Sequence, residues 1–392
     1  MTRPIAFSAA RIFDGNRFHD NASLLVEDGS ILGIVAQGQI PSHYASHPSI
    51  GAMIVPGFVD LQVNGGGGAL FNEMPTMAGI RTICEAHARF GTTALLATLI
   101  TDAPQAREKA LAAGKQAIQA RLPGFLGLHL EGPHLSIPRK GVHVAEFIRP
   151  MEGPDLACLI AAQGSFGKSL TTIAPENVTL EQVRALVDAG WHVSLGHTDC
   201  DADTAFAYFE AGACMATHLF NAMSQMRNRE PGLVGATLTT DKAYCGMIAD
   251  GHHIANANMR VALHAKQGPG RIFFVTDAMS PTGTDVTEFI LGGRQTFRRD
   301  GRLALADGTL AGADIDMISM IRKALDSLPL SLEEALKMAS RYPSEAIGAT
   351  TKGWLKSGFD ADFLILEQGL ALQSTWIGGA CVHQNSDTGA AL

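Results

Sequence analysis

The sequence predicts an α/β fold, namely a (β/α)8 TIM-like barrel with a small β-sandwich domain that is built from both termini. Three observations lead to this prediction. Eight apolar, strand-like runs alternate with alanine-rich, helix-like runs through the middle of the chain. Short β-like runs closed by turn residues occupy both ends. The 392 residues also exceed one ordinary domain and suffice for a barrel of about 250 residues with an accessory part.

The two ends of the chain share the same β-like character. Near the start, the runs cover 10–15, 23–29 and 31–35, and the first two end in Asp-Gly, which is typical of tight turns. Near the end, similar runs cover 362–366, 375–379 and 381–383. We therefore assign 1–53 and 351–392 to one small β domain, and 54–350 to the barrel.

The eight expected barrel strands are mostly continuous apolar runs, as required of a parallel sheet that is covered on both faces. They span 54–62, 92–98, 125–131, 170–174, 192–197, 213–218, 244–250 and 272–277. The main alternative is an open, doubly wound sheet. No Gly-x-Gly-x-x-Gly follows a strand, and the glycine run at 64–68 is interpreted as a flexible loop, which disfavours that alternative.

Composition excludes several classes of protein. Hydrophobic residues make up 46% and charged residues 17%, so a large core can form and global disorder is excluded. The formal net charge is −8 with no basic block, which argues against a nucleic-acid partner. The longest apolar stretch, near 94–100, is far shorter than the roughly 18 residues of a membrane span. With no secretory signal and six scattered cysteines, we expect a cytoplasmic protein without membrane contact.

Polar, ligand-capable side chains end most of the apolar strands. They are Gln62 and Asn64, Glu131, His197, His218, Asp250 with His252 and His253, and Asp277. A barrel gathers the carboxyl ends of its strands around one mouth, so these residues are expected to converge. Two imidazoles with two carboxylates suit Zn²⁺ or a similar divalent ion.

These residues lie in segments that resemble the N-acetylglucosamine-6-phosphate deacetylases of the amidohydrolase superfamily. The likeness covers almost the whole chain in the same order. The matching segments are PGFVDLQVNG (56–65), HLEGP (129–133), SLGHT (194–198), ATHLFNAM (216–223), REPG (229–232), ADGHH (249–253) and VTDA (275–278). The ATHLFNAM and REPG segments together are highly specific, whereas the Thr-Asp pair alone would be weak.

The resemblance implies a role for each matching residue. Glu131, His197 and His218 would bind the metal, Asp277 would act as general base and then acid, and His143 would polarise the acetyl carbonyl and contact the substrate. The remaining substrate-binding positions would be His253, Arg229, Asn221 and the backbone of Ala222. In the family the counterpart of Arg229 reaches into the neighbouring subunit's site, so a homodimer is implied.

Gln62 and Asn64 stand where many members of the superfamily carry His-x-His. Amides are weak ligands for zinc, and the end of the fourth strand, 172–176, offers no lysine for a bridging carbamate. We therefore expect one divalent metal per subunit, Zn²⁺ first and Fe²⁺, Co²⁺ or Mn²⁺ as alternatives, with Gln62 and Asn64 as secondary site residues. The expected reaction converts N-acetyl-D-glucosamine 6-phosphate to D-glucosamine 6-phosphate and acetate. Alternatives are the galactosamine isomer, a cyclic amide of the dihydroorotase kind, or a barrel that binds sugar phosphate without turnover.

Overall fold

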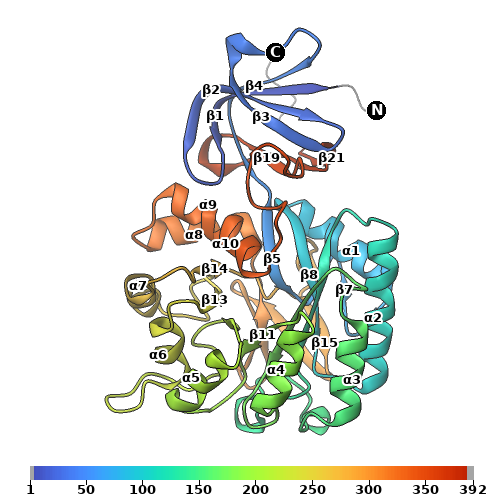
Figure 1. Ribbon diagram of the computed structural model, residues 1–392, viewed down its shortest axis with the longest axis vertical. Coiled ribbons are helices and arrows are strands. Elements are labelled where there is room, and N and C mark those ends of the chain that lie inside the picture. Colours follow the sequence, from blue (N-terminus) through green and yellow to red (C-terminus); the bar gives the residue numbers. More distant parts are fainter. Residues whose placement is uncertain (1–3, 386–392) are drawn as a thin grey trace.

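The computed structural model describes residues 4–385 and confirms the predicted fold class. Eight parallel strands follow one another around the barrel in chain order (Figure 1). They are β5 (Phe58–Val63), β8 (Thr92–Ile100), β9 (Gly124–Glu131), β10 (Lys168–Ile173), β11 (His192–Leu195), β12 (Met215–Ala216), β13 (Tyr244–Met247) and β14 (Ile272–Phe274). The barrel is closed by hydrogen bonds from Asp277 N to Gln62 O (3.0 Å) and from Asn64 N to Ala278 O (2.9 Å).

Helices surround these strands, and several begin after a residue whose side chain caps them. The helices between strands are α1 (Met77–Ala88), α2 (Pro104–Gln119), α3 (Gly153–Ala162), α4 (Leu180–Asp188), α5 (Ala202–Glu210), α6 (Gly232–Thr239) and α7 (Asn256–Ala265), and three more follow the last strand, α8 (Met317–Ser327), α9 (Leu332–Ala339) and α10 (Arg341–Ala346). Thr179 and Gln182 form a capping box on α4, and Asp201 caps α5 through Thr204 N. The helices pack on the sheet through one continuous apolar core.

The terminal strands form one seven-stranded sheet at one end of the barrel (Figure 1). Its order is β21 (Ala380–Gln384), β20 (Leu372–Ile377), β19 (Phe363–Leu366), β4 (Ala45–Pro56), β1 (Ile5–Phe13), β2 (Phe18–Glu27) and β3 (Ser30–Ala36). Only β1 and β4 are parallel neighbours. The sheet has its own core, in which Phe7, Phe363 and Trp376 pack against one another. Residues 1–3 and 386–392 of the predicted small domain lie outside the described range.

The strand predicted over 54–62 is divided at Gly57. Ile54 to Pro56 pair with β19 in the small sheet, whereas β5 begins at Phe58 and pairs with β8. A Cβ at Gly57 would lie 2.0 Å from Thr93 Oγ1, so only glycine allows the chain to pass here. Because β5 runs away from the small sheet, the carboxyl ends of the barrel strands lie at the opposite end of the barrel (Figure 1).

A four-stranded antiparallel meander, which is absent from the predicted fold, follows β14. Its strands are β15 (Glu288–Leu291), β16 (Arg294–Arg299), β17 (Arg302–Leu305) and β18 (Leu310–Ala313). Its apolar residues pack with side chains at or beyond the carboxyl ends of barrel strands, in a cluster of Leu70, Ile100, Met279, Leu291, Leu303 and Ala311. The glycine run, which was expected to form a flexible loop, lies in a short hairpin of β6 (Gly65–Gly66) and β7 (Ala69–Leu70), with Gly65 and Gly66 buried and Gly67 and Gly68 exposed at its turn.

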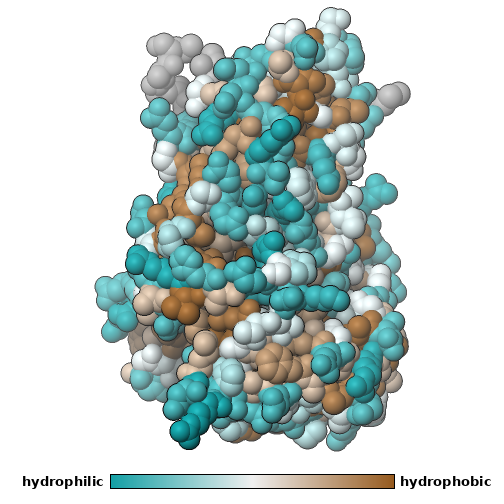
Figure 2. All heavy atoms as spheres, turned by 60° about the vertical axis from the view of Figure 1, so that its left-hand side comes forward, coloured by the Kyte–Doolittle hydropathy of each residue, from teal (hydrophilic) through white to brown (hydrophobic). Residues whose placement is uncertain are grey.

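Within the part of the chain that the structure describes, no helix combines the length and the apolar character needed to cross a bilayer. On the face shown in Figure 2, hydrophilic residues are interspersed with hydrophobic ones over both the small domain and the barrel.

Asp155, in the first turn of α3, anchors the end of the loop that follows β9. It accepts hydrogen bonds from Arg107 (2.9 Å) and Arg149 (2.5 and 2.6 Å), and its side chain is 5% exposed. Burial raises the pKa of Asp155, but these hydrogen bonds outweigh it and hold the pKa well below the ordinary 3.8. A carboxyl with a lowered folded pKa stabilises the fold above its ordinary pKa, and this contribution is lost as the pH falls.

We expect Asp155→Asn to lower the free energy of unfolding by about 3 kcal/mol at pH 7, because two partly buried guanidinium groups lose their counter-charge. The difference from the parent protein should shrink as the pH falls toward 4 and below. Urea unfolding at several pH values measures both effects. An equal difference at every pH would mean that the charge of Asp155 contributes nothing.

Candidate active site

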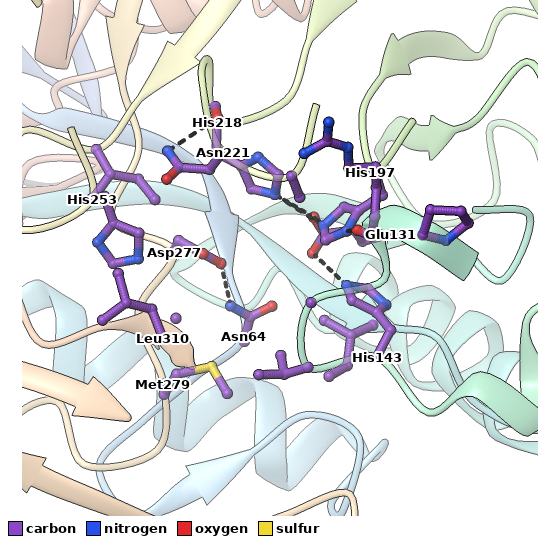
Figure 3. A pocket seen from close by; sticks show the side chains of 18 residues that line it. Asn64, Glu131, His143, His197, His218, Asn221, His253, Asp277, Met279 and Leu310 are labelled. Atoms are coloured by element: carbon purple, nitrogen blue, oxygen red, sulfur yellow. Dashed lines mark hydrogen bonds and ion pairs between the residues drawn. The ribbon is translucent and has the colours of Figure 1, made fainter. Parts of the chain in front are cut away.

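A cavity of about 300 Å³ lies at the carboxyl ends of the barrel strands (Figure 3). Nine of the residues predicted for the site line it: Asn64, Glu131, His143, His197, His218, Asn221, Ala222, His253 and Asp277. Gln62 lies beside it and contacts two of these residues, Glu131 and Asp277. The structure thus brings together side chains that end or follow six of the eight strands, and His143 from the loop after β9.

Glu131, His197 and His218 point toward one another (Figure 3). His197 Nε2 lies 3.2 Å and His218 Nε2 lies 3.1 Å from Glu131 Oε1, and the two imidazole Nε2 atoms are 3.1 Å apart. Tetrahedral zinc ligands at about 2.0–2.1 Å from the ion lie roughly 3.3–3.4 Å from one another. The three atoms therefore form a triangle of nearly the size that one such ion requires.

An unusual backbone conformation directs the side chains of His197, His218 and Asp277 into the cavity. His197, His218 and Asp277 each have a positive φ (47°, 31° and 50°), which non-glycine residues rarely adopt. Each lies two or three residues beyond the end of an apolar strand, so the sharp change of direction turns its side chain into the mouth. Such backbone strain concentrates at functional sites.

The surroundings of the triangle suit a divalent cation. His197 Nδ1 donates to Arg139 O at 2.8 Å, which leaves its Nε2 free as a ligand. Burial raises the pKa of Glu131, but the neighbouring imidazoles of His197 and His218 outweigh it and hold that pKa well below the ordinary range. A buried group of Glu131, His143 and His197, with ligand atoms within 4.8 Å of one another, is likewise consistent with a divalent metal site.

Asp277 lies across the cavity from His143 and is held by two amides (Figure 3). Asn64 Nδ2 donates to Asp277 Oδ1 at 2.6 Å, and Gln62 Nε2 donates to the same oxygen at 3.2 Å. Gln62 Nε2 also lies 3.1 Å from Glu131 Oε1 and thus connects the two carboxylates. Burial, followed by the nearby charge of Glu131, raises the pKa of Asp277 to about 6. Both amides act as donors to carboxylates here, which agrees with their being poor metal ligands.

The part of the cavity that is lined by His253, Asn221 and Ala222 offers polar groups for a ligand. His253 Nδ1 donates to Asp250 Oδ2 at 2.7 Å, which fixes the ring and leaves Nε2 for a further contact. Asn221 and Ala222 follow His218 in a turn where Ala222 has φ 49°. Arg229 does not line this cavity; it lies in the exposed segment 225–229.

Some residues of the cavity were not predicted. Arg139, Ile100, Val142, Met279, Leu310 and Gly312 all line it. Leu310 and Gly312 come from the meander, whose alternating strands and Gly-Gly and Asp-Gly turns at 292–293 and 300–301 could have revealed it. Arg139 lies four residues before His143 and is paired with Asp199 at 2.6 Å, a contact with no signal in the sequence.

The comparisons with known proteins agree with this geometry. Residues 53–382 match the amidohydrolase family. The chain is 37% identical over 377 residues to the N-acetylgalactosamine-6-phosphate deacetylase of Shewanella sp. (strain ANA-3), covering 96% of this chain and 95% of that protein. It is 32% identical over 361 residues to the N-acetylglucosamine-6-phosphate deacetylase of Haemophilus influenzae, covering 91% and 93%.

Solved structures show the same likeness. The N-acetylglucosamine-6-phosphate deacetylase of Pasteurella multocida superposes with a TM-score of 0.93 at 32% identity, over 97% of this chain and all of that one. A variant of the Mycobacterium smegmatis enzyme, in complex with N-acetyl-D-glucosamine-6-phosphate, gives 0.90 at 30% identity over 97% and 99%. The chain therefore belongs to the amidohydrolase family. Within that family it belongs to the group of amino-sugar-6-phosphate deacetylases.

Proposed function

We propose that this protein hydrolyses the acetamide of N-acetyl-D-glucosamine 6-phosphate to give D-glucosamine 6-phosphate and acetate. One observation carries the proposal: the ligand triangle of Glu131, His197 and His218 shares a single cavity with the Asp277 carboxylate. Hydrolysis of an amide requires a Lewis acid that polarises the carbonyl group, a base that takes a proton from water, and a proton for the leaving amine. This cavity offers a group for each.

Glu131, His197 and His218 would hold one divalent ion, for which Zn²⁺ is our first choice. Such an ion supplies Lewis-acid polarisation and lowers the pKa of water. The amides of Gln62 and Asn64 are committed to Asp277 and Glu131, which supports a single ion in each subunit.

Asp277 is proposed as the group that moves the proton. Both amide donors contact Oδ1, so we assign proton transfer to Oδ2. Oδ2 takes one proton from the attacking water and delivers it to the amide nitrogen, so that the C–N bond breaks and the sugar leaves as a neutral amine. The acetic acid that carries the new C–O bond then loses its proton to solvent and becomes acetate. His143 donates a hydrogen bond to the carbonyl oxygen, where negative charge develops.

The remaining groups are proposed to position the substrate. His253, fixed by Asp250, would contact a sugar hydroxyl, and Asn221 and the backbone of Ala222 would contact the sugar phosphate. The apolar side chains of Ile100 and Val142, which line the cavity together with His143, suit the acetyl methyl group.

A second candidate is the galactosamine isomer of the substrate. The relative from Shewanella, 37% identical over 95% of its length, is an N-acetylgalactosamine-6-phosphate deacetylase. The two sugars differ only in the orientation of one hydroxyl group, and either fits the machinery described above. The cyclic-amide and non-catalytic alternatives have less support, because the site carries a complete ligand triangle and base while positions 62 and 64 hold no histidine.

The decisive experiment measures acetate release from both 6-phosphorylated N-acetylhexosamines, with and without a chelator. We expect chelator-sensitive turnover, with the larger kcat/KM for the glucosamine derivative. A larger kcat/KM for the galactosamine derivative would instead establish the second candidate. Turnover that survives complete removal of metal would contradict the proposal.

Arg229 is proposed to act on the substrate of a second copy of the chain in a homodimer, since it lies outside its own cavity. We expect Arg229→Ala to raise KM about 30-fold or more, because a bidentate contact to phosphate is lost, with a smaller change in kcat. Arg227→Ala, in the same exposed segment, is the matched control. Mixing Arg229→Ala with an inactive variant should restore part of the activity through hybrid dimers, and a monomeric protein in sedimentation would contradict the role.

A further inference from the structure

The ring of His143 is held on one side by Thr101. Thr101 N donates to His143 Nδ1 at 3.3 Å, and Thr101 Oγ1 lies 2.8 Å from the same nitrogen. Both residues are buried, with 3% and 2% of their surface exposed. A backbone N–H can only donate a hydrogen bond, so His143 Nδ1 must offer a lone pair. The ring proton then resides on Nε2.

Thr101 and His143 both lie in segments that other parts of the fold hold in place. Thr101 follows directly on β8, where Ile100 is the register partner of Glu131, so its amide lies next to the ligand triangle. The His143 loop is held from the other side by the meander, because the Arg294 guanidinium donates to Val142 O. The contact therefore joins two elements that are each fixed independently.

The Nε2–H tautomer determines which contacts His143 can make. A pyrrole-type Nε2–H has no lone pair for a cation, but it can donate to an oxygen. His143 Nε2 lies 4.0 Å from Glu131 Oε2, and the ring lines the cavity (Figure 3). His143 therefore stands beside the ligand triangle as a donor, even though its distances alone would also admit it as a ligand.

We propose that Thr101 is a positioning residue which fixes the Nε2–H tautomer of His143, so that His143 donates to the carbonyl oxygen of the substrate and does not bind the metal ion. The part of this inference that concerns the carbonyl rests on the proposed function. The tautomer and the exclusion from the metal rest on hydrogen-bond geometry alone.

The tautomer can be measured without substrate. Zinc-loaded protein labelled with ¹⁵N-histidine is compared by long-range ¹H–¹⁵N NMR with the His143→Gln variant, which identifies the two nitrogen signals of His143. We expect a pyridine-type signal for Nδ1 and a pyrrole-type signal for Nε2. The reverse assignment, or a metal-coordinated Nε2, would overturn the inference even if the enzyme deacetylates the expected sugar.

Kinetics test the role of the hydroxyl group. Thr101→Val keeps the shape and the backbone donor but removes Oγ1; we expect kcat to fall about tenfold, with KM and bound metal unchanged. Thr101→Ser should recover kcat to within about twofold of the parent protein. Loss of metal from folded Thr101→Val, or full kcat in that variant, would contradict the positioning role. If Thr101→Val does not fold, the NMR measurement on the parent protein still decides the tautomer.

Discussion

Replacing Asp277 with asparagine is expected to lower kcat about 10³-fold while KM changes little, because a positioned proton-transfer group contributes about 10²–10⁴-fold. Asparagine keeps the shape of the side chain and one oxygen that can still accept from Asn64 and Gln62. The fold and the substrate contacts should therefore survive. Only the ability to take and return a proton is removed.

Steady-state acetate release measures this loss. The matched control is Asp326→Asn, the same chemical change at an exposed position of α8, which should retain the parent rate. The melting temperature and the metal content of Asp277→Asn should equal those of the parent protein. A kcat within a few fold of the parent value would exclude Asp277 as the proton carrier.

The second prediction with a large expected effect distinguishes the roles of His218 and His143, which line the same cavity. We expect His218→Gln to lose metal affinity by more than about 100-fold, because replacing even an outer partner of a ligand typically costs 10–100-fold. We expect His143→Gln to keep the metal but lose about 10²–10³-fold in kcat, since it removes one donor to the developing oxyanion. The distances support this division, because His218 Nε2 lies 3.1 Å from both partners whereas His143 Nε2 lies 4.0 Å from Glu131.

Metal analysis of the purified variants, followed by titration with Zn²⁺, tests whether His218 binds the metal and His143 does not. His264→Gln, in α7, is a suitable control for the substitution itself. Excess Zn²⁺ should partly restore His218→Gln and should leave His143→Gln unchanged. Loss of metal from His143→Gln together with retention by His218→Gln would assign the ligands the other way round.

The sequence was sufficient for the fold class because the apolar runs and their turn residues reflect burial directly. It placed strand ends less well. Strands predicted to reach His197, His218 and Asp277 end two or three residues earlier, at Leu195, Ala216 and Phe274. The left-handed backbone of the three polar residues removes them from the ladder, and propensity does not reveal such strain in a non-glycine residue.

For the candidate site, the sequence likewise predicted which residues lie there but not how their side chains contact one another. Residues that end strands could be inferred, since a barrel gathers strand ends at one mouth. Contacts between side chains could not be inferred from spacing. The two amide donors on Asp277 and the Thr101 contact to His143 depend on the register between neighbouring strands, and Leu310 reaches the cavity only through the meander.

The seven-stranded sheet has a consequence for how the chain is made. On the ribosome, β4 emerges about 300 positions before β19, its antiparallel neighbour in the finished protein. Throughout synthesis of the barrel, one edge of the nascent N-terminal sheet thus lacks its partner, and open edges are sites of self-association. Prematurely terminated chains that stop short of Phe363 should therefore be especially prone to aggregate.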